Sequence, residues 1–308
     1  VVNENGELVG LMQQSAGDTI NSYAVGASLA ASLATTSLTY SSDLYKKIDI
    51  PVALPPTQKE ALTTLYLIQG YAYTHNRDRY LLPLDEYQSL YPDSYEGHLM
   101  RAEYLALADS ALECAREEWG EALRVTEKPD DVHYNISKVY ATMLSRTSES
   151  DALQMRDSAI VHIEKAVDIK PEPLYIQHKA ELLYAKGDYA SSFECYMALS
   201  QTNMGGAVTF VAASRCKEAL EEWDAAIACM DSAVNAFGEE TATFAAPYII
   251  NRAMLKQRAK RYREAVLDYN TYASLREGQL NASFYYSREQ AEFEAKIEER
   301  IRAEYAQE

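Results

Sequence analysis

The 308-residue sequence has no long apolar run and few cysteines, and each absence excludes a class of protein. No stretch reaches the roughly 18–20 apolar residues that a membrane-spanning helix needs, so no membrane insertion is expected. The cysteines form no C-x-x-C pair and the histidines no His/Cys cluster, which predicts neither a metal site nor a cofactor. All four cysteines lie in predicted helices among small or apolar residues and are expected to be buried thiols, with a Cys216–Cys229 disulfide as the alternative: Cys114, Cys195, Cys216 and Cys229.

Basic residues are also scarce. The chain has 29 Lys and Arg against 46 Asp and Glu, a formal net charge of −17. Nucleic-acid binding depends on clustered Lys and Arg that displace counterions from phosphates, so no nucleic acid is expected as a partner.

The sequence offers no catalytic constellation. Cys216 lies between Arg215 and Lys217, which could lower the pKa of its thiol, but no histidine is placed beside it. The adjacent glycines 205 and 206 follow no predicted strand and precede no Lys-Ser/Thr, so they predict a turn rather than a phosphate-binding loop. The chain is therefore not expected to be an enzyme.

Small residues recur at a regular spacing. Five predicted helices each have a marked position near their end, at residues 122, 166, 199, 233 and 272. Successive positions are 44, 33, 34 and 39 residues apart. A period near 34, with small residues where helices cross, is typical of a helix–turn–helix solenoid. Each position follows a small residue by seven: Ala115 and Ala122, Ala159 and Ala166, Ser192 and Leu199, Ala226 and Ala233, Ala265 and Tyr272. The prediction is an all-α solenoid of about seven helix pairs, 57–92, 95–126, 129–169, 173–202, 206–236, 242–275 and 281–308.

One unit shows the turn clearly. Pro171 and Pro173 precede a helix over 174–185, and Gly187-Asp188-Tyr189 separates it from a helix over 189–200. Gly187 suits the left-handed conformation at a helix end. This unit resembles a tetratricopeptide repeat, whose consensus has Gly-Asp-Tyr at the turn, Ala three residues after the Tyr and Pro at the end; here Ser192 replaces the Ala. The resemblance implies a non-catalytic scaffold that binds proteins or extended peptides on the concave face of a superhelix.

Tyrosine is abundant, at 24 residues against six Phe. The ratio favours rings that fill the seams between helices with their hydroxyls at the rim; a tyrosine-lined ligand groove is the alternative.

The resemblance also implies which side chains face the groove. In the family they occupy the second, fifth, ninth, twelfth and thirteenth positions of each first helix. The four basic ones would favour an anionic extended peptide, unless they pair with Glu181, Glu218 and Glu292. The Lys and Asn with which chaperone-binding repeats clamp a terminal carboxylate are absent at these positions. The groove residues are Tyr134, Lys138, Gln177, Glu181, Tyr184, Arg215, Glu218, Met254, Gln257, Arg258, Tyr285 and Arg288.

The first forty residues follow a different pattern. Asn5-Gly6 lies between strand-like runs 1–4 and 7–12 and predicts a hairpin turn. Another strand-like run covers 21–26, a short helix is predicted over 28–34, and the proline-containing stretch 41–56 predicts a linker.

Residues 1–36 resemble the end of a trypsin-like serine peptidase domain of the bacterial heat-shock protease type. Val1-Val2-Asn3, Gly6–Leu11 and Ser22–Val25 carry the resemblance. The catalytic residues of that family have no counterparts in this chain. The resemblance implies a barrel remnant over 1–40 and a periplasmic or secreted protein. The alternative function is thus the C-terminal accessory portion of such a peptidase, and a structural or nutrient-capture role in a bacterial envelope is a third interpretation.

Overall fold

The computed structural model describes residues 10–13, 23–26, 57–146, 149–238 and 243–305, and the chain divides into two units, Val1–Thr57 and Gln58–Glu308. In the first unit, strand β1 (Gly10–Gln13) pairs antiparallel with β2 (Tyr23–Gly26), and Gly10 lies opposite Gly26. Both strands overlap strand-like runs of the sequence. The expected turn at Asn5-Gly6, the helix over 28–34 and the linker over 41–56 lie outside the described residues.

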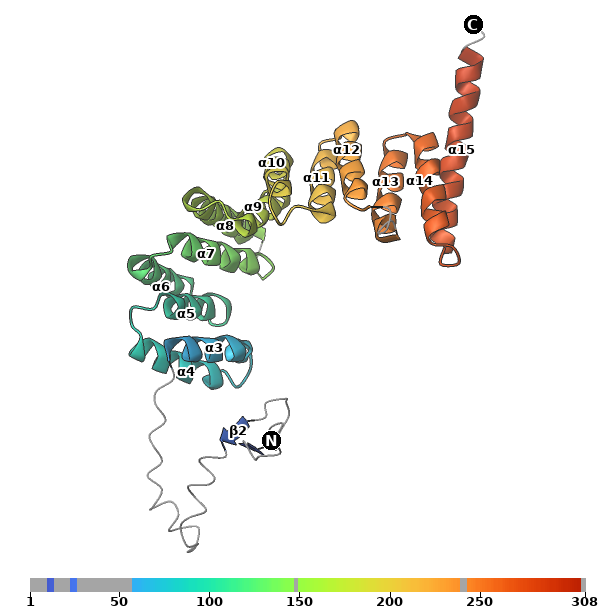
Figure 1. Ribbon diagram of the computed structural model, residues 1–308. Helices are drawn as coiled ribbons and strands as arrows, with labels where there is room; N and C mark the ends of the chain where they lie inside the picture. Colours follow the sequence, from blue (N-terminus) through green and yellow to red (C-terminus); the bar gives the residue numbers. More distant parts are fainter. Residues whose placement is uncertain (1–9, 14–22, 27–56, 147–148, 239–242, 306–308) are drawn as a thin grey trace, which may run out of the picture. The chain divides into compact units, whose positions relative to one another are not determined.

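The second unit consists of helices that pair in chain order (Figure 1). Each helix contacts the next one along the chain, and α5 also contacts α7, so successive pairs stack into a solenoid. The elements are α3 (Gln58–Ile68), the 3-10 helix η1 (Gln69–Tyr73), α4 (Asp78–Leu90), α5 (Tyr95–Leu107), α6 (Leu112–Val125), α7 (Pro129–Leu144), α8 (Glu149–Ile169), α9 (Pro173–Lys186), α10 (Tyr189–Ser200), α11 (Ala207–Ala219), α12 (Trp223–Asn235), α13 (Ala246–Arg258), α14 (Tyr262–Leu275) and α15 (Ala282–Tyr305).

The predicted seventh pair is wrong. Residues Ala282–Tyr305 form one continuous helix, α15, where the sequence analysis expected two helices within 281–308. No Gly or Pro follows Gly278, so nothing in the local sequence ends a helix there. The described part of the second unit therefore contains six pairs and a single final helix.

The small residues lie where the helices cross, as predicted. Ala115, Ala159, Ala226 and Ala265 are each 0% exposed, and so is Ser192. The Ser192 hydroxyl donates a 2.8 Å hydrogen bond to the Ala180 carbonyl on the partner helix. A serine can thus replace alanine at a crossing because the opposite backbone satisfies its hydroxyl.

The turn at Gly187 also has the predicted geometry. Gly187 ends α9 with φ 89°, and the Asp188 side chain accepts a 3.2 Å hydrogen bond from the Ser191 amide at the start of α10. Three other turns use a non-glycine residue with positive φ, namely Ser110, Glu221 and Lys260. These residues adopt a conformation that L side chains rarely occupy.

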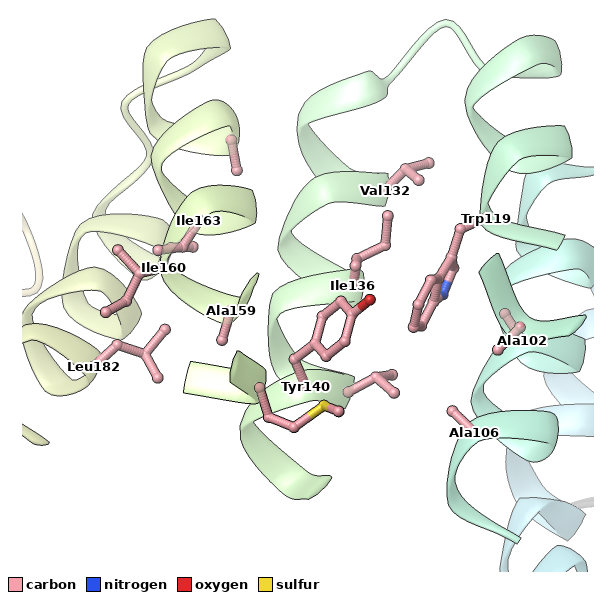
Figure 2. Packing of buried hydrophobic residues seen from close by; sticks show 14 of the residues in the cluster. Ala102, Ala106, Trp119, Val132, Ile136, Tyr140, Ala159, Ile160, Ile163 and Leu182 are labelled. Carbon is pink, nitrogen blue, oxygen red and sulfur yellow. The ribbon is translucent and has the colours of Figure 1, made fainter. Parts of the chain in front are cut away.

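Tyrosine rings fill the seams between helices. Tyr87 and Tyr269 are 2% and 0% exposed. The Tyr269 hydroxyl donates to Gln257 at 2.7 Å, and the Tyr87 hydroxyl lies 2.8 Å from the Ser94 hydroxyl. Figure 2 shows the largest apolar cluster, in which the Trp119 ring of α6 lies 5.2 Å from the Tyr140 ring of α7. The seam interpretation therefore holds for these tyrosines.

The cysteines are free, and one of them departs from the prediction. Cys216 and Cys229 are buried and Cys195 is half-buried, but Cys114 is exposed on α6. Cys114 precedes the fully buried Ala115, so it lies on the outward face of the same helix turn. Burial raises the pKa of the Cys216 and Cys229 thiols, which leaves them protonated and poorly nucleophilic at neutral pH. The Cys216–Cys229 disulfide, the alternative to free thiols, is not formed.

The described residues contain neither a membrane-spanning helix nor a cluster of metal-binding side chains. None of their helices is both long and apolar enough to cross a bilayer. Within the same residues, no group of three or more His, Cys, Asp or Glu side chains could hold a metal ion.

Candidate protein-binding groove

Four of the predicted groove residues come together in one hollow. Arg215 and Glu218 extend from α11, and Met254 and Arg258 extend from α13, the first helix of the next pair. The side chains of two successive first helices thus line a single hollow. We call this site the α11–α13 hollow; it is lined by Val211, Ser214, Arg215, Glu218, Met230, Asn251, Met254, Leu255 and Arg258 and encloses about 120 Å³.

The charges of the α11–α13 hollow only partly cancel. The Arg258 guanidinium pairs with the Glu218 carboxylate across the two helices. Arg215 is exposed and makes no ion pair with any side chain in the described part of the chain. Met254 is 44% exposed. The hollow therefore offers one uncompensated cation beside an apolar thioether.

The predicted groove residues of α7 and α9 form local contacts instead. The Lys138 ammonium lies 5.4 Å from the centre of the Tyr134 ring, a cation–π geometry. On α9, Gln177 donates to Glu181 at 2.9 Å, and the Tyr184 ring lies 5.1 Å from the Tyr189 ring. These side chains are placed on first helices as expected, but they do not line the α11–α13 hollow.

The remaining three predicted residues are Gln257 on α13 and Tyr285 and Arg288 on α15. Gln257 accepts the hydrogen bond of the buried Tyr269 and so has a structural role. Tyr285 is 47% exposed on α15, and Arg288 pairs with Glu292 at 3.0 Å on the same helix. Two of the four cations thus pair with carboxylates, which is the alternative that the sequence left open.

A second hollow carries the opposite charge, and the sequence analysis did not predict it. Glu96 and Glu103 from α5 and Asp131 from α7 line it, and Lys138 is the one predicted groove residue among its lining side chains. We call it the acidic hollow; it encloses about 340 Å³ between Leu62, Tyr66, Gln69, Tyr95, Glu96, Leu99, Met100, Glu103, Trp119, Asp131, Asn135, Lys138 and Val139.

The acidic hollow escaped prediction because the repeat register was carried no farther upstream than Tyr134. Glu96, Glu103 and Asp131 all precede that residue. One signal was present: Glu96 and Glu103 are seven residues apart and therefore share a face of one helix.

The stacked helix pairs, the small residues at their crossings and the left-handed turn at Gly187 define a helical-hairpin solenoid of the tetratricopeptide type. No protein-family profile matches the sequence. No curated protein matches it either.

Two solved structures have a similar fold. The structure of Naa15/Naa10 bound to HypK-THB has a TM-score of 0.50 and 12% identity, and the match covers 82% of this chain and 43% of that one. The human IFIT1 dimer with PPP-AAAA also has a TM-score of 0.50, with 17% identity over 77% of this chain and 54% of that one. YrrB, described as a TPR protein with an unusual peptide-binding site, has a TM-score of 0.42 and 15% identity over 66% of this chain and 91% of that one.

Proposed function

We propose that this chain is a non-catalytic scaffold that binds an extended segment of another protein along the face formed by its first helices. The α11–α13 hollow is the observation that carries the proposal. It joins Arg215 of one repeat to Met254 and Arg258 of the next, so a bound segment would contact successive repeats. Contacts shared between repeats are how solenoids use an extended surface.

The lining of this hollow fits an acidic side chain or a free carboxylate of the bound segment. Arg215 supplies an unpaired guanidinium, which binds carboxylates through two parallel hydrogen bonds. Met254 and Val211, which line the same hollow, provide apolar contact beside it. The partner is therefore a protein or peptide that carries an anionic group where it contacts the α11–α13 hollow. The rest of the bound segment need not be anionic.

The test is selection of ligands without a charge bias. A displayed library of random dodecapeptides is selected on the full chain, and the enriched peptides are measured by fluorescence anisotropy. Because a groove contact in the centre of an interface contributes strongly, Met254→Ala or Arg215→Glu should weaken binding about tenfold or more. Arg124→Glu is the matched control, since Arg124 is exposed on the second helix α6. Enriched peptides that bind all three variants like the wild type would refute the groove.

The proposal also states that the chain has no hydrolytic activity of its own. A serine-directed fluorophosphonate should leave the protein unlabelled, and peptide and ester substrates should stay intact. Stoichiometric labelling of any serine would overturn this part of the proposal.

A second candidate function is the C-terminal accessory portion of a periplasmic or secreted trypsin-like peptidase, with residues 1–40 as the barrel remnant and 41–56 as the linker. The antiparallel pairing of β1 with β2 favours it, because the resemblance places strands in this segment. The coding sequence upstream of Val1 tests it directly. Gly-x-Ser-Gly-x-Pro immediately before Val1 would support this function, and its absence there would remove the candidate.

A further inference from the structure

The carboxylates of the acidic hollow have no cationic partner. Glu96, Glu103 and Asp131 line the hollow, and none of them forms an ion pair with a side chain that the structure describes. The α11–α13 hollow differs, since its Glu218 is paired with Arg258. The acidic hollow thus concentrates uncompensated negative charge in a concave site, which raises the local concentration of cations.

Neutral groups supply the hydrogen bonds of these carboxylates. The Tyr95 hydroxyl donates to Asp131 at 3.2 Å, and the Gln69 amide donates to Glu103 at 2.8 Å. Neutral donors hold the carboxylates in position but leave their full charge. Lys138 is the one cation among the lining residues, and its ammonium lies over the Tyr134 ring.

The titration of the surrounding groups agrees with this negative field. Burial raises the pKa of the Tyr66 hydroxyl, and the charges of Glu96 and Asp131 raise it further. Burial likewise raises the pKa of the Asp131 carboxyl; the charges of Asp130 and Glu96 add to that effect, and the Tyr95 hydrogen bond and the charge of Lys128 oppose it. A cation placed in the hollow would reduce the repulsion among these negative charges.

Trp119 gives an independent indication of a ligand. Trp119 is 4% exposed and lines the same hollow, and its indole N–H has no hydrogen-bond partner among the described residues. A buried donor without an acceptor costs about 1–3 kcal/mol. A bound chain that turns the ring toward the hollow could supply a backbone carbonyl to this donor, whereas a bare metal ion could not.

We infer that the acidic hollow binds a lysine or arginine side chain of the extended segment that the groove takes. The inference rests on the proposed function and deepens it. Carboxylates provide charge-assisted hydrogen bonds to such a cation, and the rings of Tyr66 and Tyr95 provide cation–π contacts. The partner segment then carries a basic residue where it meets α5 and α7 and an acidic group where it meets α11 and α13.

Tryptophan fluorescence measures this binding directly, because the sequence contains only Trp119 and Trp223. In a Trp223→Phe background, Trp119 reports on the acidic hollow. The probe is an octapeptide of alternating Lys and Ala, titrated at 150 mM salt, where the screening length is about 8 Å. An octapeptide of alternating Gln and Ala serves as the neutral probe. The Lys-Ala peptide should give a saturable change in Trp119 emission, and the Gln-Ala peptide should give none.

Paired charge variants separate the hollow from general attraction of a cation to an acidic protein. Glu103→Gln with Asp131→Asn should weaken binding of the Lys-Ala peptide about tenfold or more. Glu117→Gln with Glu127→Gln removes the same charge from exposed positions in and after α6 and should leave binding unchanged. If Trp223→Phe lowers the helical far-UV signal, 5-fluorotryptophan in the otherwise unaltered chain resolves Trp119 by fluorine NMR.

Equal weakening by the two double variants, or no change at Trp119, would overturn the inference. Its failure is distinct from failure of the proposed function. Library peptides that still depend on Met254 while the Lys-Ala peptide gives no specific response would refute the acidic hollow alone. If the library peptides do not depend on Met254 and the Lys-Ala peptide also gives no specific response, the groove as a whole is refuted.

Discussion

Arg252 of α13 binds Asp268 of α14 through two parallel hydrogen bonds, 2.9 Å from Nε and 2.7 Å from its second amino group. The same guanidinium reaches Asp231 of α12 at 2.7 Å, and Lys256 also pairs with Asp268 at 2.9 Å. The side chains of Arg252, Lys256 and Asp268 are only 16%, 11% and 7% exposed. This network joins one helix pair to the next through charges that are nearly buried.

Removal of the central carboxylate should be costly. Asp268→Ala would leave two nearly buried cations short of their shared partner, so we expect the free energy of unfolding to fall by about 3–5 kcal/mol. Asp224→Ala is the control, because Asp224 forms an exposed pair with Arg261 and its loss should cost less than about 1 kcal/mol. Urea unfolding followed by circular dichroism measures both variants, and equal losses would contradict the buried-network account.

The crossing positions should tolerate no added volume. Ala226 is 0% exposed between α11 and α12, so Ala226→Leu should overpack the seam and cost about 1–3 kcal/mol. Ala190→Leu, at an exposed position of α10, adds the same volume and should change stability little. The thermal melting temperatures of the two variants provide the comparison; a fully stable Ala226→Leu protein would show that this crossing is not tightly packed.

The sequence predicted those parts of the fold that depend on local chemistry. Pro171, Pro173 and Gly187 mark the limits of α9, and α9 runs from Pro173 to Lys186. The small residues predicted the crossings because only a short side chain lets two helices approach. The predicted seventh pair over 281–308 was wrong because the chain after Gly278 contains no helix breaker, and Ala282–Tyr305 forms one helix.

The groove depends on tertiary geometry and was predicted only in part. Arg215 and Met254 could be placed together because their repeats share a register. The pairing of Arg258 with Glu218 depends on the spacing of two helices, which no local pattern encodes. Glu96 and Asp131 lie on different helices of pairs without a recognisable turn, so their meeting in one hollow needed the structure.

Two turns without glycine offer a gain in stability. Glu221 and Lys260 both have φ 59°, where a side chain is disfavoured. Glu221→Gly or Lys260→Gly should relieve this strain and raise the free energy of unfolding by about 1 kcal/mol. Gly187→Ala, at φ 89°, should lower it by a similar amount. Denaturant midpoints test the three variants, and destabilisation by both glycine substitutions would contradict the argument.

A pair of histidines should make the solenoid sensitive to acid. Nδ1 of His133 on α7 lies 3.0 Å from Nδ1 of His162 on α8. Burial lowers the pKa of His162 to about 4, and the charges of His133 and Lys165 add to the effect. The unfolded chain has an ordinary histidine pKa of about 6.5 and so binds more protons in this range. The stabilisation from neutral His162 is thus complete above about pH 6.5 and declines as the pH falls toward 4. His162→Gln removes the titration, so its urea midpoint should fall less than that of the wild type between pH 7 and pH 4.5. Parallel pH profiles for the two proteins would show that His162 does not carry the acid sensitivity.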